Sequence, residues 1–264
     1  MVKLYKNFNI NKNHKGSIIL IGNFDGVHLG HQKLFKLAQS YKKKYNLKIG
    51  VINFDPMPKM FFNQSLKNFR LSSINQKIDL LNNLGVDFIA TKKFDRTFSK
   101  TKSINFIKNI LYQKLNAKFI FVSNNFRFGN KREGDVNLLI KNEKKYKYKV
   151  VEPKPLIVNQ KVVSSTLIRN LLENGFLEKA NKLLGRNWSI VGIVQKGRQI
   201  GKKIGFPTCN ISIKDYVLAK PGVYAVKVLR KNNSKYIKGI ANLGYRPTFN
   251  QKKILLEVHL FNFS

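Results

Sequence analysis

Short apolar runs alternate with segments of helical spacing through the first part of the chain. The strand-like runs lie at 17–21, 49–54, 86–90, 119–122 and 148–151. Between two of them, apolar residues recur every three to four positions over 74–84, with Ser73 and Gln76 as a capping box and Gly85 as the stop. This alternation predicts an α/β domain with a parallel sheet flanked by helices. Ligands of such sheets bind beyond the carboxyl ends of the strands, where the loop 22–26 is expected.

The pattern changes after Gly185. Residues 164–173 and the segment after Gly175 up to residue 184 are predicted as two short helices. Farther on, the period shifts towards two at 189–195, 222–229, 236–242 and 254–263, with glycine- and proline-bearing turns between these runs. We therefore predict two domains, an α/β domain over 1–184 and a small antiparallel β-barrel over 186–264.

Bulk properties agree with a globular protein of two domains. The 264 residues exceed the length of about 100 to 200 residues that is usual for one domain, and 43% of them are hydrophobic. No stretch approaches the apolar length of a membrane span, and residues 1–16 lack the core of a signal peptide. A single cysteine, Cys209, excludes an internal disulfide, and four scattered histidines do not form a zinc-binding pattern. We expect a cytoplasmic protein without membrane association.

The charge is strongly basic, with 50 Lys and Arg against 13 Asp and Glu and a formal net charge of +37. Alone, this balance would favour a nucleic-acid partner. However, the lysines are spread over nearly every segment and accompany abundant Asn, Ile and Phe, as biased base composition would produce. No recognised nucleic-acid module is present. We expect non-specific polyanion binding at low salt and no specific nucleic-acid partner.

The most informative segment is GNFDGVHLGH, which runs from Gly22 to His31 directly after an apolar strand. It places His28 and His31 at the start of a predicted helix. Free backbone N–H groups and the helix dipole attract anions there, and imidazoles can donate hydrogen bonds to charge that builds during a reaction. The segment therefore points to a chain of phosphates and to nucleotidyl transfer. The alternative is a pair of ordinary surface histidines.

This string resembles the GxFDGxHxGH signature of the bacterial bifunctional riboflavin kinase/FAD synthetase family, within the wider group of HxGH nucleotidyltransferases. Other segments resemble the family in family order: NFDPMP at 53–58, NFRFG at 125–129, SSTLIR at 164–169, GFPTCN at 205–210 and LEVHL at 256–260. The resemblance implies a Rossmann-like FMN adenylyltransferase domain followed by a riboflavin kinase domain. It also implies ATP, FMN and riboflavin as small-molecule substrates, and Mg²⁺ as cofactor.

For the first domain, the resemblance implies that His28 and His31 bind the ATP phosphates and the transition state. Ser165, Thr166 and Arg169 would hold the β- and γ-phosphates from the other side, and one helical turn separates Thr166 from Arg169. The attacking phosphate is already ionised at neutral pH, so positioning and electrostatics should supply most of the acceleration. The remaining nucleotide-binding candidates in the loop are Gly22, Asn23, Phe24, Asp25, Gly26 and Gly30.

Asn125, Arg127 and Phe128 resemble the flavin-side loop of the family, where an amide reads the ring edge and an aromatic ring stacks on its face. Phe128 shares strand spacing with Phe126, so ordinary core packing is the alternative for it. The chain departs from the family in three ways: Ser123 stands for a usual glycine, an acidic residue is usual near Asn125, and Met57 stands for a histidine. Met57 removes a polar contact but keeps bulk, so we expect it to alter affinity or rate without altering the class of reaction.

Riboflavin phosphorylation requires a base, because a ribityl hydroxyl is a poor nucleophile at pH 7. By resemblance Glu257 is this base if its strand face points into the site; otherwise it is a solvated carboxylate. Thr208 and Asn210 are the implied ligands of Mg²⁺, together with ATP phosphates. The implied phosphate-wrapping loop contains Gly197, Gly201, Lys202 and Gly205.

The sequence stops at Ser264, soon after the Glu257 strand, whereas the family continues with another strand and a helix. We therefore expect a truncated kinase barrel with open strand edges and exposed apolar surface, which puts kinase activity in doubt. Two other functions stay open: an HxGH transferase for a different phosphorylated acceptor, and a non-catalytic remnant that binds flavin or polyanions. The sequence does not fix the oligomeric state.

Overall fold

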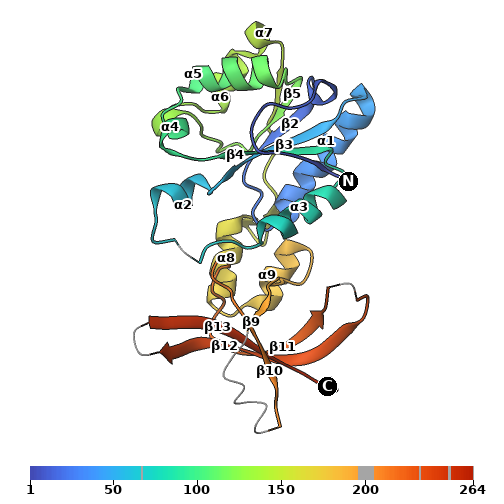
Figure 1. The fold of residues 1–264 in the computed structure, drawn as a ribbon. Helices are drawn as coiled ribbons and strands as arrows, with labels where there is room; N and C mark the ends of the chain where they lie inside the picture. The colour runs from blue at the N-terminus through green and yellow to red at the C-terminus, as the bar shows by residue number, and fades with distance from the viewer. Residues whose placement is uncertain (67, 196–204, 232, 249–250, 264) are drawn as a thin grey trace. The chain divides into compact units, whose positions relative to one another are not determined.

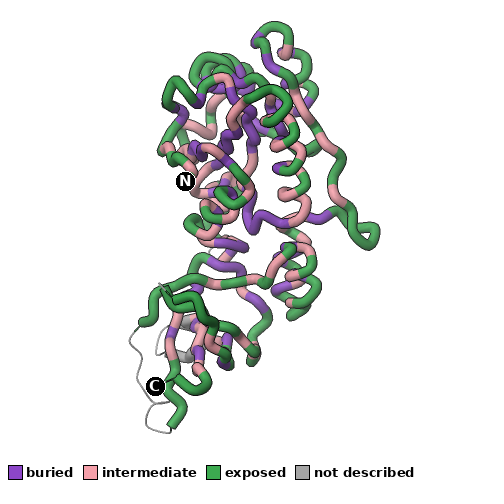
Figure 2. The backbone as a smooth tube through the Cα atoms, turned by 90° about the vertical axis from the view of Figure 1, so that its right-hand side faces the viewer, coloured by how far each residue is buried: buried purple, intermediate pink, exposed green. Residues whose placement is uncertain are grey.

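The computed structural model describes residues 1–66, 68–195, 205–231, 233–248 and 251–263. They form two compact units (Figures 1 and 2). The first unit comprises Met1–Leu66, Ile74–Ser165 and Leu183–Gly185, and the second comprises Lys67–Ser73, Thr166–Lys182 and Arg186–Ser264. The units interleave along the chain, since residues 166–182 group with the later strands. The domain limits 1–184 and 186–264 therefore stay a prediction from the sequence.

A six-stranded parallel sheet is the centre of the first unit, with the order β1-β4-β3-β2-β5-β6. The strands are β1 (Lys3–Tyr5), β2 (Ile18–Ile21), β3 (Ile49–Asp55), β4 (Phe88–Lys93), β5 (Phe119–Phe121) and β6 (Lys149–Val151). The five predicted strands are confirmed within two or three residues. The pattern does not predict β1, because this short outer strand contains no apolar run and is mostly exposed.

Helices cover both faces of this sheet. They are η1 (Lys12–His14), α1 (Leu29–Tyr45), α2 (Pro58–Phe62), α3 (Ile74–Asn83), α4 (Arg96–Ser99), α5 (Ser103–Asn105), the π-helix η2 (Phe106–Lys114), η3 (Asn130–Arg132), α6 (Val136–Lys141) and α7 (Glu143–Tyr146). Two short strands, β7 (Ile157–Val158) and β8 (Lys161–Val162), form a hairpin. Alternate residues of β2 enter two cores, Leu20 with Phe35 of α1 on one face and Ile19 with Leu111 of η2 on the other. The helix predicted over 74–84 is confirmed as α3, and Gly85 after it has the left-handed φ of +72°.

Gly50 in β3 shows how tightly the sheet packs on its helices. A Cβ atom at this position would lie 2.1 Å from Cζ of the buried Phe88. We expect Gly50→Ala to lower the free energy of unfolding by about 1–3 kcal/mol, because the ring must shift inside a close-packed core. A urea titration measures this loss. Gly222→Ala, which has no atom within 4 Å of the added methyl group, is the control, and equal losses for the two variants would contradict the packing.

The second unit contains most of α8 (Ser165–Glu173) and α9 (Leu177–Leu184), together with an antiparallel sheet. Its strands are β9 (Val194–Gln195), β10 (Thr208–Ile211), β11 (Gly222–Leu229), β12 (Tyr236–Thr248) and β13 (Gln251–Leu260), in the order β11-β12-β13-β10-β9. The predicted antiparallel fold is confirmed. β13 lies inside the sheet, while β11 and β9 are the outer strands of the part that the structure describes.

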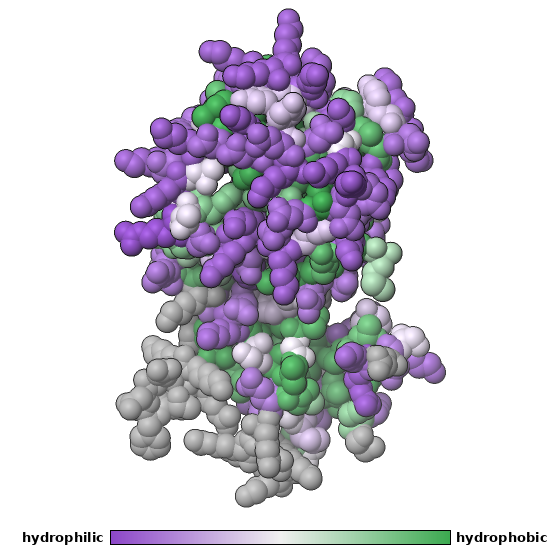
Figure 3. Space-filling view, turned by 45° about the horizontal axis from the view of Figure 1, so that its top comes forward, coloured by the Kyte–Doolittle hydropathy of each residue, from purple (hydrophilic) through white to green (hydrophobic). Residues whose placement is uncertain are grey.

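Figure 3 shows hydrophilic side chains distributed over the visible face of the first unit. Within the described residues, no helix combines the length and the apolar character that a membrane crossing needs.

Candidate active sites

The segment GNFDGVH leaves the carboxyl end of β2, a central and fully buried strand, and leads into α1. Phe24, Gly26 and Val27 all have left-handed backbone conformations, with φ of 47°, 76° and 38°. Such a φ is rare for a β-branched residue and costs on the order of 1–3 kcal/mol, and residues held in this way cluster at functional sites. Burial of Phe24 and Val27, which are 4% and 1% exposed, holds the loop in this shape.

The two histidines lie together at the start of α1. His28 is the N-cap residue, and its ring stacks on that of His31 with centroids 3.6 Å apart and an interplanar angle of 22°. The ring of Phe24 contacts His31 edge-on at 5.1 Å. Gly30 allows this arrangement, since a Cβ atom there would lie 3.2 Å from both the His28 ring and the carbonyl oxygen of Val163. The alternative of two ordinary surface histidines is not supported, because His28 is buried.

His31 is held in its neutral form. Burial, and secondarily the proximity of His28, keep the pKa of His31 well below its ordinary value of 6.5. Its Nδ1 atom is buried and has no hydrogen-bond partner among the described residues. At neutral pH this side chain is therefore an uncharged imidazole with a hydrogen-bonding atom available to a ligand.

This pKa sets a pH dependence of stability. The unfolded chain takes up a proton on His31 near pH 6.5, whereas the folded protein takes it up only at a lower pH. The contribution of neutral His31 to the free energy of unfolding is therefore complete above pH 6.5 and is lost as the pH falls below it. His14, whose pKa burial also lowers, acts in the same direction. We expect urea titrations of the ligand-free protein to give a lower free energy of unfolding at pH 5.5 than at pH 7.5. His31→Gln should weaken this dependence, and an unchanged dependence would contradict the assignment.

Two contacts from other elements fix the loop. Ser165 Oγ donates a hydrogen bond to the carbonyl oxygen of Asp25 at 2.9 Å, so the SSTLIR segment reaches the loop in the first unit. Lys77 of α3, which is buried, donates from Nζ to the carbonyl oxygen of Asn23 at 3.3 Å. The sequence pattern did not indicate Lys77, because a lysine on a helix is normally exposed. We infer that Lys77 is a positioning residue for the loop.

Two buried amide oxygens near the carboxyl ends of the central strands lack a hydrogen-bond donor among the described residues. They are Oδ1 of Asn23, just after β2, and Oδ1 of Asn53, in β3. A buried acceptor without a donor is costly unless a ligand or water supplies one. Hydroxyl or amino groups of a nucleotide have the required chemistry. Asn53 was not singled out from the sequence, although it begins the NFDPMP segment.

Thr166 and Arg169 lie on α8 in the second unit, one turn apart as predicted. Arg169 is buried, and Nε donates to the carbonyl oxygen of Phe69 at 2.7 Å while the guanidinium lies 3.7 Å from the centroid of the Phe69 ring. These two contacts fix the orientation of the guanidinium. The predicted convergence of Thr166 and Arg169 with the histidines on one triphosphate stays a prediction.

The flavin-side loop divides into exposed and buried residues. Asn125 and Arg127 are exposed; Asn125 Oδ1 accepts a hydrogen bond from Ser123 Oγ at 2.9 Å, and Arg127 lies 3.4 Å from the carboxylate of Asp135. Phe128 is 8% exposed and packs against Phe126 and Phe106 in the core. This packing is compatible with the core alternative for Phe128. A role in flavin binding stays a prediction for Asn125, Arg127 and Phe128.

The second unit presents a row of polar residues across its sheet. The register places Asn242 of β12 opposite Glu257 of β13, Glu257 opposite Asn210 of β10, and Asn210 opposite Gln195 of β9. Directly opposite residues project from the same face of a sheet, so these four side chains share one face. Thr208, two residues before Asn210, belongs to this face as well. The structure thus brings Glu257, Asn210 and Thr208 together and adds Asn242 and Gln195.

Asn210 is the most buried member of this polar row, at 8% exposure, and its Oδ1 atom has no hydrogen-bond partner in the described residues. Oδ1 is a hard oxygen donor, which fits an oxygen-binding cation such as Mg²⁺. Of the predicted phosphate-wrapping residues, Gly197, Gly201 and Lys202 lie outside the described residues. Gly205 has a φ of +82°, in the left-handed region that favours glycine.

A parallel sheet with paired histidines at the helix after its central strand defines a nucleotidyltransferase domain, and the polar row defines a separate site on an antiparallel sheet. Comparison with known proteins agrees with both. The family model described as FAD synthetase matches residues 10–167, and the one described as riboflavin kinase matches residues 184–264. The chain belongs to the bifunctional riboflavin kinase/FMN adenylyltransferase family.

Individual relatives give the degree of similarity. The bifunctional riboflavin kinase/FMN adenylyltransferase of Buchnera aphidicola subsp. Schizaphis graminum is 44% identical over 259 residues, which cover 97% of this chain and 83% of that protein. The Escherichia coli K12 protein of the same name is 38% identical over 248 residues, or 94% of this chain and 79% of the relative. A crystal structure from Streptococcus pneumoniae, described as a macrolide-efflux protein, has a TM-score of 0.86 at 26% identity and covers 100% of this chain and 85% of its own.

Proposed function

We propose that this protein is an enzyme with two activities: it transfers AMP from ATP to FMN, giving FAD and pyrophosphate, and it phosphorylates riboflavin with ATP to give FMN. The single observation that carries the first activity is the stacked pair of His31 and the buried His28 at the N-terminus of α1. The polar row around Glu257 supports the second activity. Membership of the bifunctional family supports both.

In the adenylyl transfer, a phosphate oxygen of FMN forms a bond to the α-phosphorus of ATP while the bond from that phosphorus to the β-bridging oxygen breaks. The nucleophile is already an anion, so the protein need not remove a proton. Its task is to hold two anions together and to stabilise the charge that gathers on pyrophosphate. The N-terminus of α1 and hydrogen bonds from the imidazoles do this at the His28 and His31 end. Ser165, Thr166 and Arg169 complete the phosphate contacts in this proposal.

In the kinase reaction, the carboxylate of Glu257 accepts the proton of the terminal ribityl hydroxyl as the oxygen bonds to the γ-phosphorus of ATP, and ADP leaves. Oxygens of Thr208 and Asn210 would hold Mg²⁺ together with the ATP phosphates. The described residues contain no group of three or more His, Cys, Asp or Glu that could hold a metal ion. Few protein ligands suit Mg²⁺, which usually keeps several waters and phosphate oxygens. When bound, the ion neutralises charge on the phosphates.

The proposal is tested with purified protein, ATP and Mg²⁺ in two separate incubations, one with FMN and one with riboflavin. Chromatography should show FAD in the first and FMN in the second, followed there by FAD. Absence of FAD from FMN would remove the adenylyltransferase proposal, and pyrophosphate release with another phosphorylated acceptor would replace it. Absence of FMN from riboflavin would remove the kinase proposal. Binding of flavin without either product would favour the non-catalytic alternative.

The location of the protein and the absence of nucleic-acid and membrane partners stay predictions from the sequence. We propose a cytoplasmic location, where ATP and free flavins are available, and no specific nucleic-acid or membrane partner.

A further inference from the structure

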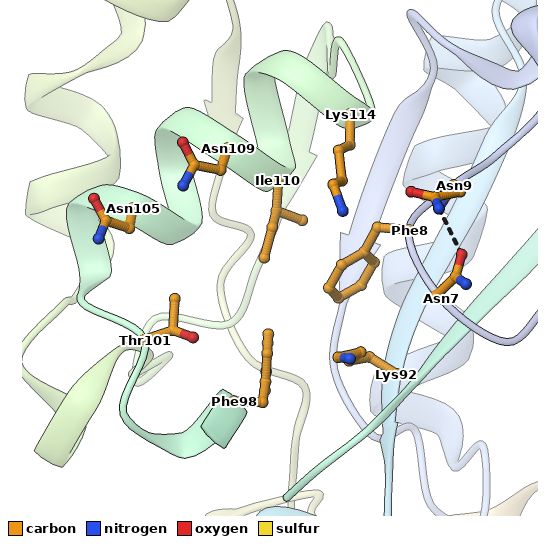
Figure 4. A pocket seen from close by; sticks show the side chains of 10 residues that line it. All are labelled: Asn7, Phe8, Asn9, Lys92, Phe98, Thr101, Asn105, Asn109, Ile110 and Lys114. Atoms are coloured by element: carbon orange, nitrogen blue, oxygen red, sulfur yellow. Dashed lines mark hydrogen bonds between the residues drawn. The ribbon is translucent and has the colours of Figure 1, made fainter. Parts of the chain in front are cut away.

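The first unit contains a half-open cavity that neither reaction uses. It has a volume of about 480 Å³ and lies between η2, the segment 7–9 and the end of β4. None of its ten lining residues is among those assigned to either reaction. Its size is within the range of small-molecule sites, about 300–1,000 Å³. Figure 4 shows the cavity with its lining side chains.

The cavity is positively charged. Lys114 reaches it from η2 and Lys92 from β4, and Figure 4 shows the two amino groups near opposite sides of the Phe8 ring. No lining residue is acidic, and neither lysine has a carboxylate partner among the described residues. Two ammonium groups without counterions, at the rim of one concave surface, attract an anion.

Uncharged donors accompany the two lysines. Asn105 and Asn109 of the same helical region and the hydroxyl of Thr101 line the cavity. Apolar contact is provided by Ile110 and by Phe98, whose ring centroid lies 5.7 Å from Nζ of Lys92. A few polar groups around an apolar surface are the usual composition of a site for a small organic molecule.

The π-helix explains why these groups meet. An α-helix turns by about 100° per residue, which would place Lys114 about 180° from Asn105, on the opposite side. A π-helix has i→i+5 hydrogen bonds, such as the bond from the Leu115 N–H to the carbonyl oxygen of Ile110 at 3.0 Å, and turns by only about 80° per residue. Over nine residues this rotation returns Lys114 to the side of Asn105. Stretches of π-helix are rare and frequently lie at functional sites.

We propose that this cavity is a binding site for a small phosphate monoester. Its phosphate group pairs with the amino groups of Lys92 and Lys114, and its organic part lies against Phe98 and Ile110. A phosphate monoester carries up to two negative charges, which match the two lysines. Its three terminal oxygens can also accept hydrogen bonds from the amides and the hydroxyl, whereas a carboxylate has only two oxygens and one charge.

Phenyl phosphate is a suitable probe, with benzoate as the carboxylate comparison. The δ-methyl NMR signal of Ile110, assigned with Ile110→Leu, reports binding in the cavity itself and separates it from binding at the ATP sites. At low ionic strength, phenyl phosphate should shift this signal in a saturable way and bind at least fivefold more tightly than benzoate. This comparison uses the wild-type protein and does not depend on any variant.

Lysine variants then test the two charges. Lys92→Gln and Lys114→Gln should each raise the dissociation constant of phenyl phosphate about 3- to 10-fold, and the double variant more than 10-fold. Lys108→Gln, an exposed η2 lysine that does not line the cavity, should leave it unchanged. An unmoved Ile110 signal, equal affinities for phenyl phosphate and benzoate, or equal affinities in all variants would each overturn the proposal.

Discussion

Replacing His31 by alanine is expected to lower kcat for FAD formation by about 100- to 1,000-fold, while the dissociation constant for FMN changes less than about threefold. The reason is the position of this ring: it stacks on His28 at the N-terminus of α1, where the transferring phosphates are proposed to lie. A hydrogen bond used mainly in the transition state affects rate more than ground-state binding. Chromatography of FAD gives the rate, and quenching of FMN fluorescence gives the affinity.

Lys33→Ala is the matched control for this prediction. Lys33 is exposed on α1, two residues after His31, so its truncation tests whether any side-chain loss near the start of this helix lowers the rate. Riboflavin phosphorylation by the His31 variant is an internal control for folding and should be unchanged. Parallel losses of FMN affinity and of rate would show that His31 belongs to the flavin site, contrary to the proposal.

Replacing Glu257 by glutamine is expected to reduce riboflavin phosphorylation by about 100- to 10,000-fold and to leave FAD formation from supplied FMN intact. Glutamine keeps the size of the side chain and its hydrogen-bonding oxygen, but it cannot accept the proton of the ribityl hydroxyl. Because Glu257 lies opposite both Asn210 and Asn242 in the sheet register, the substitution changes the chemistry of the polar row without changing its packing. The rate of ADP release with riboflavin measures the effect.

Glu178→Gln removes a comparable carboxylate from an exposed position of α9 and should keep full kinase activity. If Glu257→Gln also retained most of its activity, Glu257 would be the solvated carboxylate that the sequence left open. If both activities of the Glu257 variant failed together, the loss would reflect folding rather than catalysis.

The sequence predicts those parts of the fold that depend on local patterns. The runs that became β2 to β5 are mostly buried and largely apolar. Gly85, Gly175 and Gly185 all have the left-handed φ expected of glycines that end helices. The loop GNFDGVHLGH could be placed after a strand and before a helix for the same reason. Its backbone strain could not be predicted, since Val27 has a φ that its own side chain disfavours and only tertiary packing enforces.

Other features depend on pairings between distant segments. Asn242 and Gln195 have unremarkable neighbours in the sequence, and only the register of four strands aligns them with Asn210 and Glu257. The burial of Phe128 depends on Phe106, far from it along the chain. An α-helix would show the same apolar spacing as η2, so this spacing does not predict the π-helical geometry. These features define the sites in detail, and only the three-dimensional structure reveals them.

The central claim is that the paired imidazoles and the N-terminus of α1 form a site for the ATP polyphosphate. A crystal structure with a non-hydrolysable ATP analogue tests it most directly. We predict phosphate oxygens within about 2.7–3.2 Å of ring nitrogens of His28 or His31. A polyphosphate bound away from both rings would contradict the account.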